Sequence, residues 1–418
     1  MDDLRITADA IFRRESGKII AGLIRVSGSF DLAEEAMQDA FAAALVSWEA
    51  GIPDNPAAWI TAVARRKLID YARRERTRLD KQDQLLYETE TTTSAEDPIG
   101  DADMNFPDDR LRLIFTCCHP ALNREAQVAL TLRTLGGLTT PEIARAFLVP
   151  EPTLAQRLVR AKRKIQDAHI PYEVPDERAL PERLASVQTV IYLIFNEGYT
   201  ATAGDSLIRR ELCAEAIRLA RTLCELMPGQ PENIGLLALM LLHDSRRDAR
   251  VSPDGELVPL EEQDRSTWHR EQINEGLRLV ESALGMGRPG PYQLQAAIAA
   301  LHGEAATAAQ TDWKQIAALY QALLQRNGSP VVALNHAVAV AMSQGIEAGL
   351  SLLDRLGASG ELDSYHLYHA ARADLLRRLG SRERALEAYD RALALTTNAV
   401  ERRYLRRRVA ELEKPSST

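Results

Sequence analysis

The stretch LTTPEIARAFLVPEPTLAQRLVRAKRKIQDA, residues 138–168, decides the fold class of this chain. Thr140 is followed directly by Pro141, which predicts the capped start of a short helix, because proline suits the first helical turn. Residues 148–150 predict a tight turn, and Glu151 or Pro152 opens a longer helix. Two helices joined in this way are typical of a helix-turn-helix.

The longer of these helices has two chemically different faces. A row at helical spacing predicts a buried stripe made of Leu154, Leu158, Ala161 and Ile165. The opposite face carries Thr153, Gln156, Arg157, Arg160 and Arg163. Cations and hydrogen-bonding groups on an exposed helix suit the base edges and phosphates of duplex DNA. A solvated face can look the same, so the capped helix and the turn before it carry the interpretation.

Charge is distributed in blocks along the 418 residues, although the net charge is -8, from 51 basic and 59 acidic residues. Residues 65–78 hold seven basic and two acidic side chains, and residues 110–170 hold ten and four. Between them, residues 80–109 hold ten acids and one lysine, which predicts an acidic linker. Two basic units favour binding to nucleic acid despite the net negative charge.

The N-terminal part predicts three helices. Apolar residues repeat at helical spacing from Ile19 to Ile24, and Asp31 is predicted to cap a second helix. The apolar stripe of that helix consists of Ala33, Ala36, Met37, Ala40, Phe41 and Ala44. A third helix begins after Asn55 and Pro56 and mixes aromatic side chains with arginines, a pattern that suits unstacked single-stranded bases.

Two segments resemble the extracytoplasmic-function (ECF) sigma factors of RNA polymerase. FDLAEEAMQDAFAAAL (30–45) and NPAAWITAVARRKLIDYARR (55–74) resemble region two of that family, and residues 138–168 resemble its region four. In the family, the acidic helix of region two docks on the clamp helices of polymerase, and the next helix recognises and melts the minus-ten element. Region four binds the minus-thirty-five element as duplex DNA.

The resemblance implies three sets of site residues. The polymerase-contacting set is Asp31, Glu34, Glu35, Gln38, Asp39 and Phe41. The melting and minus-ten set is Trp59, Arg65, Arg66, Lys67, Asp70, Arg73 and Arg74. The minus-thirty-five set is the outward face described above. The family commonly has asparagine where this chain has Arg66, so base preference at the melted element is expected to differ.

The remainder of the chain predicts a second helical architecture. Residues 365–396 resemble a tetratricopeptide (TPR) repeat through Ala370, Leu375, Leu379, Gly380, Ala385, Tyr389 and Ala392. Tyr320 lies sixty-nine residues before Tyr389, close to two repeat periods, and residues 335–356 can fill the intervening pair. We therefore expect an all-α chain with domains at 1–79, 108–175 and 176–418, and an acidic linker at 80–107.

The segment 243–268, HDSRRDARVSPDGELVPLEEQDRSTW, interrupts the repeats and holds a predicted turn at residues 253–255. With FNEGY (195–199), it resembles the C-terminal extension of one ECF subgroup, where the extension replaces a separate membrane anti-sigma factor. A long insertion in a repeat protein favours a binding face, although a loose surface loop is the competing interpretation.

Metal and redox chemistry are disfavoured. His243, Asp244 and His269 lack metal-ligand spacing, so salt-bridged loop packing is the preferred interpretation. The four cysteines have no zinc-site spacing and are expected to be buried as small apolar residues: Cys117, Cys118, Cys213 and Cys224. We expect no catalytic residues, no metal and no cofactor.

The N-terminus lacks a secretory pattern, and no stretch approaches the roughly 18 apolar residues of a membrane span, so we expect a cytoplasmic protein without membrane contact. The expected partners are core RNA polymerase and promoter DNA, with a C-terminal domain that controls the sigma domains by direct contact or through an effector. Two alternatives stay open: a conventional dimeric helix-turn-helix regulator with a repeat sensor domain, and a protein-binding repeat scaffold.

Overall fold

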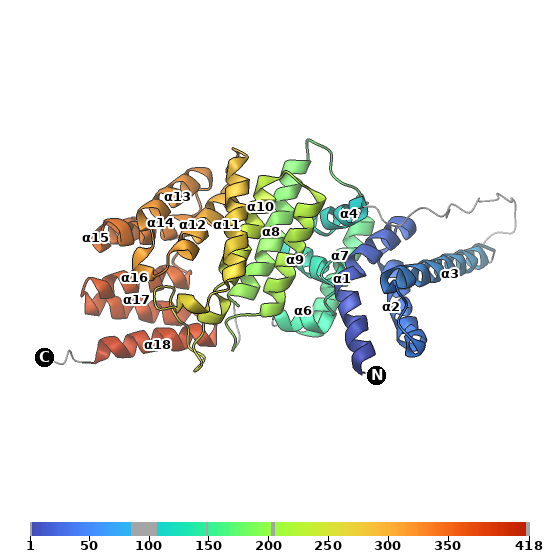
Figure 1. The fold of residues 1–418 in the computed structure, drawn as a ribbon, viewed down its shortest axis with the longest axis horizontal. Helices are drawn as coiled ribbons and strands as arrows, with labels where there is room; N and C mark the ends of the chain where they lie inside the picture. The colour runs from blue at the N-terminus through green and yellow to red at the C-terminus, as the bar shows by residue number, and fades with distance from the viewer. Residues whose placement is uncertain (1, 85–106, 148, 202–204, 415–418) are drawn as a thin grey trace. The chain divides into compact units, whose positions relative to one another are not determined.

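The described part of the chain is built almost entirely from α-helices (Figure 1). The residues described by the computed structural model are 2–84, 107–147, 149–201 and 205–414. Within them the extended pairing is a single bridge between Val251 and Leu257, and the all-α prediction is confirmed. The helices form two units, Met1–Val190 and Ile191–Thr418. No helix in these ranges is both long and apolar enough to span a membrane.

Three helices open the first unit: α1 (Asp2–Ser27), α2 (Phe30–Ser47) and α3 (Pro56–Gln84). Ser29 caps α2, because its side chain accepts a hydrogen bond from the Leu32 amide at 3.3 Å. The prediction that Asp31 is the cap is wrong, since Asp31 lies in the first turn, where its charge favours the helix dipole. The predicted apolar stripe is buried at Ala33, Ala36, Met37, Ala40 and Ala44.

Four further helices complete the helix-turn-helix part: α4 (Pro107–Cys117), α5 (Arg124–Thr134), α6 (Thr140–Ala146) and α7 (Glu151–Asp167). Thr139, rather than the predicted Thr140, caps α6. The Thr139 amide donates to a Glu142 carboxylate oxygen at 2.7 Å, and the Glu142 amide donates back to the Thr139 hydroxyl at 3.4 Å. This reciprocal capping box fixes the start of the short helix. The acidic linker predicted at 80–107 falls mostly outside the described residues.

The helices from α8 onward run to the end of the described chain. They are α8 (Leu180–Tyr199), α9 (Arg210–Leu226), α10 (Pro231–Asp244), α11 (Arg270–Gly285), α12 (Pro291–Glu304), α13 (Trp313–Arg326), α14 (Pro330–Gln344), α15 (Ile346–Gly357), α16 (His366–Arg378), α17 (Arg382–Leu395) and α18 (Ala399–Glu413). The unit boundary at Val190 lies within α8, downstream of the boundary predicted at residue 176.

Helix pairs build the second unit, as the repeat pattern predicts. In the α16 and α17 pair, Gly380 forms the turn with a φ of 77°, a left-handed conformation that favours glycine. Tyr389 of α17 is 1% exposed and lies in the core shared by α14 to α18. The colours from orange to red in Figure 1 follow these helices.

The 243–268 segment is anchored to the helices of the second unit. Its turn closes at Gly255, where φ is 77°, and the Gly255 carbonyl accepts a hydrogen bond from Arg403 of α18 at 2.8 Å. Glu261 pairs with Arg378 of α16 at 2.5 Å. A further pair joins Glu262 to Arg408 of α18, also at 2.5 Å. The segment is therefore a structured connection and not a loose surface loop.

Arg265 is the buried centre of this segment. Arg265 is 6% exposed, and its guanidinium donates to the carbonyl oxygens of His302 and Ala305 at 2.6 and 2.7 Å. It also lies 4.9 Å from the centre of the Trp268 ring. Because these carbonyls end α12, Arg265 satisfies acceptors that the helix itself leaves open.

We expect Arg265→Met to lower the free energy of unfolding of the second unit by about 2–4 kcal/mol, because buried carbonyl oxygens lose their donors. Urea unfolding followed by circular dichroism measures the change. Arg270→Met is the matched control, since Arg270 is exposed on α11 and should alter stability little. Equal losses in both variants would contradict the role given to Arg265.

Candidate nucleic-acid interface

The outward face of α7 presents the residues predicted to bind duplex DNA. The exposed members are Thr153, Gln156, Arg160 and Arg163. Beneath them the predicted stripe is buried, with relative exposures between 1% and 7%: Leu154, Leu158, Ala161 and Ile165. This row anchors α7 on its own unit, so the polar face belongs to a helix with a fixed rotation. A rigid cationic face of this kind can enter a major groove.

Arg157 differs from the other members of the predicted set. Its guanidinium lies 2.6 Å from a carboxylate oxygen of Glu125 on α5, and only 26% of its side chain is exposed. Arg157 can therefore reach DNA only by exchanging this ion pair for a phosphate or a base. Arg160 is exposed and Arg163 is paired weakly with Asp167 at 3.4 Å, so these two are better placed for contact.

The acidic face of α2 is the second predicted surface. Asp31, Glu35 and Gln38 are exposed, whereas Glu34 and Asp39 are partly buried. Phe41 packs edge-on against Phe12 of α1 with ring centres 5.0 Å apart, so part of its ring is used inside the bundle. These residues line one helix that is held by its buried alanine row.

Asp39 connects α2 to α3. The Tyr71 hydroxyl donates to its carboxylate at 2.5 Å, and the Lys67 ammonium lies 3.7 Å from the same oxygen. Two of the predicted residues, one from each set, are thus brought together. This contact fixes the rotation of α3 relative to α2.

The predicted strand-melting helix, α3, shows a mixed surface. Trp59 packs edge-on against Trp48 at 5.6 Å and is partly exposed. Arg66, Asp70 and Arg73 are exposed, and Arg65 and Lys67 are partly buried. Arg74 belongs to α3, but its side chain lies outside the described residues. An aromatic ring and exposed cations along one helix can accept an unstacked base and phosphates of the strand that carries it.

Lys162 joins α7 to α2 and was absent from the predicted sets. Its ammonium lies 2.8 Å from a carboxylate oxygen of Asp31 and 2.8 Å from one of Glu34, and only 14% of its side chain is exposed. Burial lowers the pKa of Lys162, but the two carboxylates outweigh burial and leave the pKa raised. Lys162 stays charged at neutral pH and binds the helix predicted to contact polymerase. Its position beside the buried stripe is visible in the sequence, whereas its partners are not.

A second contact in the first unit joins α1 to α4. Asp109, 2% exposed, accepts from Arg25 of α1 at 2.8 Å and pairs with Arg112 at 3.1 Å. The Tyr172 hydroxyl lies 2.8 Å from the Ala21 carbonyl oxygen, and burial together with nearby Asp109 raises its pKa. These contacts centre on the buried Asp109 and join α1 to α4.

Three of the four cysteines are buried as predicted, whereas Cys224 is partly exposed, contrary to the prediction. Cys117 and Cys118 are buried, with their sulfurs 3.2 Å from the Thr134 hydroxyl and 3.6 Å from the Thr131 hydroxyl. Burial raises the pKa of Cys118 to about 12 and that of Cys117 further. Both thiols are protonated at neutral pH and poorly reactive, and the prediction that they are core residues is confirmed.

Three parts of the chain match known protein families. Residues 11–78 match the family model for Sigma-70 region 2, and residues 112–165 match that for Sigma-70, region 4. Residues 183–284 match a family of unknown function, DUF6596. An uncharacterized protein of Rhizobium meliloti (strain 1021) is 46% identical over 402 residues, which cover 96% of this chain and 94% of the relative.

The two sigma matches fall on the helices that carry the acidic and cationic faces, and they occur in the order that the sequence predicts. The DUF6596 match covers the segment between α10 and α11. The chain therefore belongs to the sigma-70 family of RNA polymerase sigma factors, as an ECF-like member with a helical C-terminal extension.

Proposed function

We propose that this chain is an alternative sigma factor that binds core RNA polymerase through α2 and selects promoters through α3 and α7. The observation that supports the proposal most is the presence, in one unit, of an exposed acidic helix and an exposed cationic recognition helix. Each stands on a buried apolar row. A conventional regulator needs only the cationic helix.

In this mechanism α2 docks on polymerase and α7 holds the upstream element as a duplex. Phosphate contacts from the α7 arginines position the helix, and base contacts supply the sequence preference. Trp59 then receives an unstacked base, and the exposed Arg66 and Arg73, which lie further along α3, contact phosphates of the same strand. The chain contributes binding energy and no covalent chemistry.

The Lys162 contact adds a step to this mechanism. Glu34 is only 14% exposed while it holds Lys162 at 2.8 Å, so α2 and α7 must separate before polymerase can reach it, and Asp31 exchanges the same partner. Polymerase binding then favours the arrangement in which this contact is open. The C-terminal unit is proposed to modulate this equilibrium, either by contact with the first unit or by binding an effector.

The competing functions make different demands. A conventional regulator binds its operator without polymerase, usually as a symmetric dimer. A repeat scaffold binds proteins and ignores DNA. Neither requires the exposed acidic residues of α2 for activity. Variants in α2 therefore distinguish a sigma factor from both alternatives.

We expect Glu35→Lys to weaken binding to core RNA polymerase about tenfold or more, because a reversed charge faces the polymerase surface that accepts an acidic helix. Fluorescence anisotropy of labelled protein with purified core enzyme measures the affinity. Glu49→Lys is the control, since Glu49 is exposed outside α2. Similar affinities for both variants would mean that α2 is not the docking helix.

We expect Arg160→Ala to weaken promoter binding by about 1–3 kcal/mol, the value of a lost base contact. Arg157→Ala should cost less, because its guanidinium is already paired with Glu125. Electrophoretic mobility of the holoenzyme on a selected promoter fragment gives both values, with exposed Arg178→Ala as control. Unaltered binding by Arg160→Ala would remove α7 from the interface.

We expect Lys162→Met to tighten binding to core polymerase about threefold to tenfold in the absence of DNA, because Asp31 and Glu34 are released from their intramolecular partner. Lys164→Met on the exposed side of α7 controls for the lost charge. Weaker or unchanged binding by Lys162→Met would contradict a closed arrangement that competes with polymerase.

A further inference from the structure

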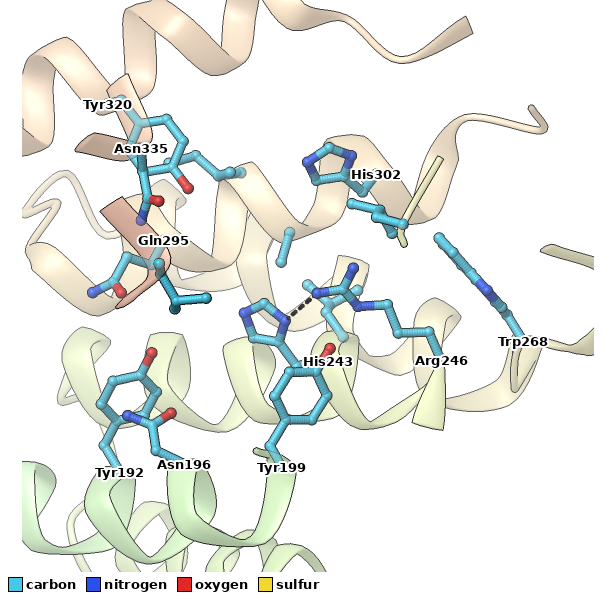
Figure 2. A pocket seen from close by; sticks show the side chains of 15 residues that line it. Tyr192, Asn196, Tyr199, His243, Arg246, Trp268, Gln295, His302, Tyr320 and Asn335 are labelled. Atoms are coloured by element: carbon cyan, nitrogen blue, oxygen red, sulfur yellow. Dashed lines mark hydrogen bonds between the residues drawn. The ribbon is translucent and has the colours of Figure 1, made fainter. Parts of the chain in front are cut away.

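The second unit contains a pocket among several of its helices (Figure 2). Its volume is about 480 Å³, within the usual range for small-molecule sites. The walls come from α8, α10, α12, α13, α14 and α16, and from the 243–268 segment. Most of the lining is aromatic or aliphatic, with a few polar groups that converge on the space.

Three of the polar atoms in the lining are buried without a hydrogen-bond partner among the described residues. They are the hydroxyl of Tyr199, Nε1 of Trp268 and Nδ1 of His302. Trp268 is only 4% exposed. An unsatisfied buried polar group is destabilising, so three such groups in one pocket indicate that a ligand supplies their missing partners. The indole N–H can only donate, so it requires an acceptor.

Arg246 supplies the charge of the pocket. Its guanidinium lies 3.1 Å from Nδ1 of His243, as the dashed line in Figure 2 marks. By contrast, its neighbour Arg247 pairs with Asp244 at 2.5 Å, and no carboxylate is found within ion-pair distance of Arg246 among the described residues. The lining contains no acidic side chain.

The two histidines beside Arg246 are neutral. Burial, with Arg246 and Arg265 nearby, lowers the pKa of His302 to about 3. Burial, with Arg246 and Arg250 nearby, lowers the pKa of His243 well below its usual value. At neutral pH the lining therefore carries the single positive charge of Arg246, surrounded by neutral donors.

The polar groups lie at two opposite ends of the pocket. Figure 2 shows Arg246, His302 and Trp268 on one side, and Asn196 and Gln295 on the other. The amide of Asn335 and the hydroxyls of Tyr192 and Tyr320 accompany the second group. A ligand that spans the pocket would meet a cation and neutral donors at one end, flat rings along its body, and amides at the other end.

We propose that this pocket binds a small planar carboxylic acid. The carboxylate would accept from Arg246, the Tyr199 hydroxyl and Trp268, and a polar substituent would meet the amides of Asn196 and Gln295. One guanidinium balances a single negative charge, which favours a carboxylate over a doubly charged phosphate. A cation is excluded because Arg246 would repel it without a carboxylate to compensate.

The regulatory meaning of this site rests on the proposed sigma function, whereas binding itself does not. The 243–268 segment supplies Arg246 and Trp268 to the pocket, and through Glu261 and Glu262 it holds α16 and α18. A bound acid would stabilise this segment by mass action and therefore alter the order of the whole unit. Ligand binding is therefore coupled to the 243–268 segment, which contacts α16 and α18.

The test is isothermal titration calorimetry of the full chain, without polymerase or DNA, using benzoate, 4-aminobenzoate, 4-hydroxyphenylacetate and indole-3-acetate. Each acid is paired with its primary amide, which has the same shape and no charge. We expect at least one acid to bind with a Kd of about 1 mM or tighter, and its amide about tenfold or more weakly. Absence of binding by all four acids, or equal binding of acid and amide, overturns the proposal.

Variants separate a binding role from a structural one. Arg246→Gln should weaken the acid at least about tenfold, whereas Arg278→Gln, exposed on α11, should not. Tyr199→Phe removes only the unpartnered hydroxyl, so it should weaken the acid about threefold or more while the Tm of the free protein stays equal or rises. A lowered Tm with unchanged affinity would overturn the assignment of Tyr199.

The two proposals fail separately. If an acid binds but the protein supports no promoter-directed transcription, the proposed function is wrong and the pocket stands. If transcription is supported but the acids and amides behave alike, the pocket proposal is wrong and the sigma function stands.

Discussion

The register of α7 is the constraint on which the first unit depends. Its row from Leu154 to Ile165 must be buried to hold the helix-turn-helix together, and this rotation leaves Arg160 and Arg163 facing solvent. The same rotation places Lys162 at the border of the buried row. A partly buried ammonium without a partner is costly, so carboxylates must approach it, and α2 supplies them. One helical register thus creates both the candidate DNA-binding face and the contact with the candidate polymerase-binding helix.

Local patterns made much of this molecule predictable. The α2 stripe and the two faces of α7 depend on spacings of three and four residues, which a sequence displays directly. The caps of α2 and α6 were misplaced by one or two residues, because serine, threonine and aspartate cap almost equally well. The partners of Lys162 lie about 130 residues away in the chain, and no local pattern can reveal such a pair. The pocket was unpredictable for the same reason, since its walls come from separate helices.

The arginines of the 243–268 segment illustrate why composition alone is insufficient. They are four of the same residue type in one segment, yet each has a different environment. Arg247 pairs with Asp244, Arg250 lies 3.6 Å from the centre of the Tyr199 ring, and Arg265 binds carbonyl oxygens at the end of α12. Arg246 alone among these four lines the pocket in Figure 2. The segment therefore combines a structural role with a candidate ligand site, which suits a domain proposed to modulate transcription.

The most direct test of the account is transcription in vitro with purified bacterial core polymerase, the full chain and a pool of genomic fragments, followed by sequencing of the transcript starts. The account predicts starts that depend on the protein and share two spaced upstream elements, one for each DNA-binding helix. Absence of such starts, together with tight binding of DNA by the protein alone, would contradict it and indicate a conventional regulator.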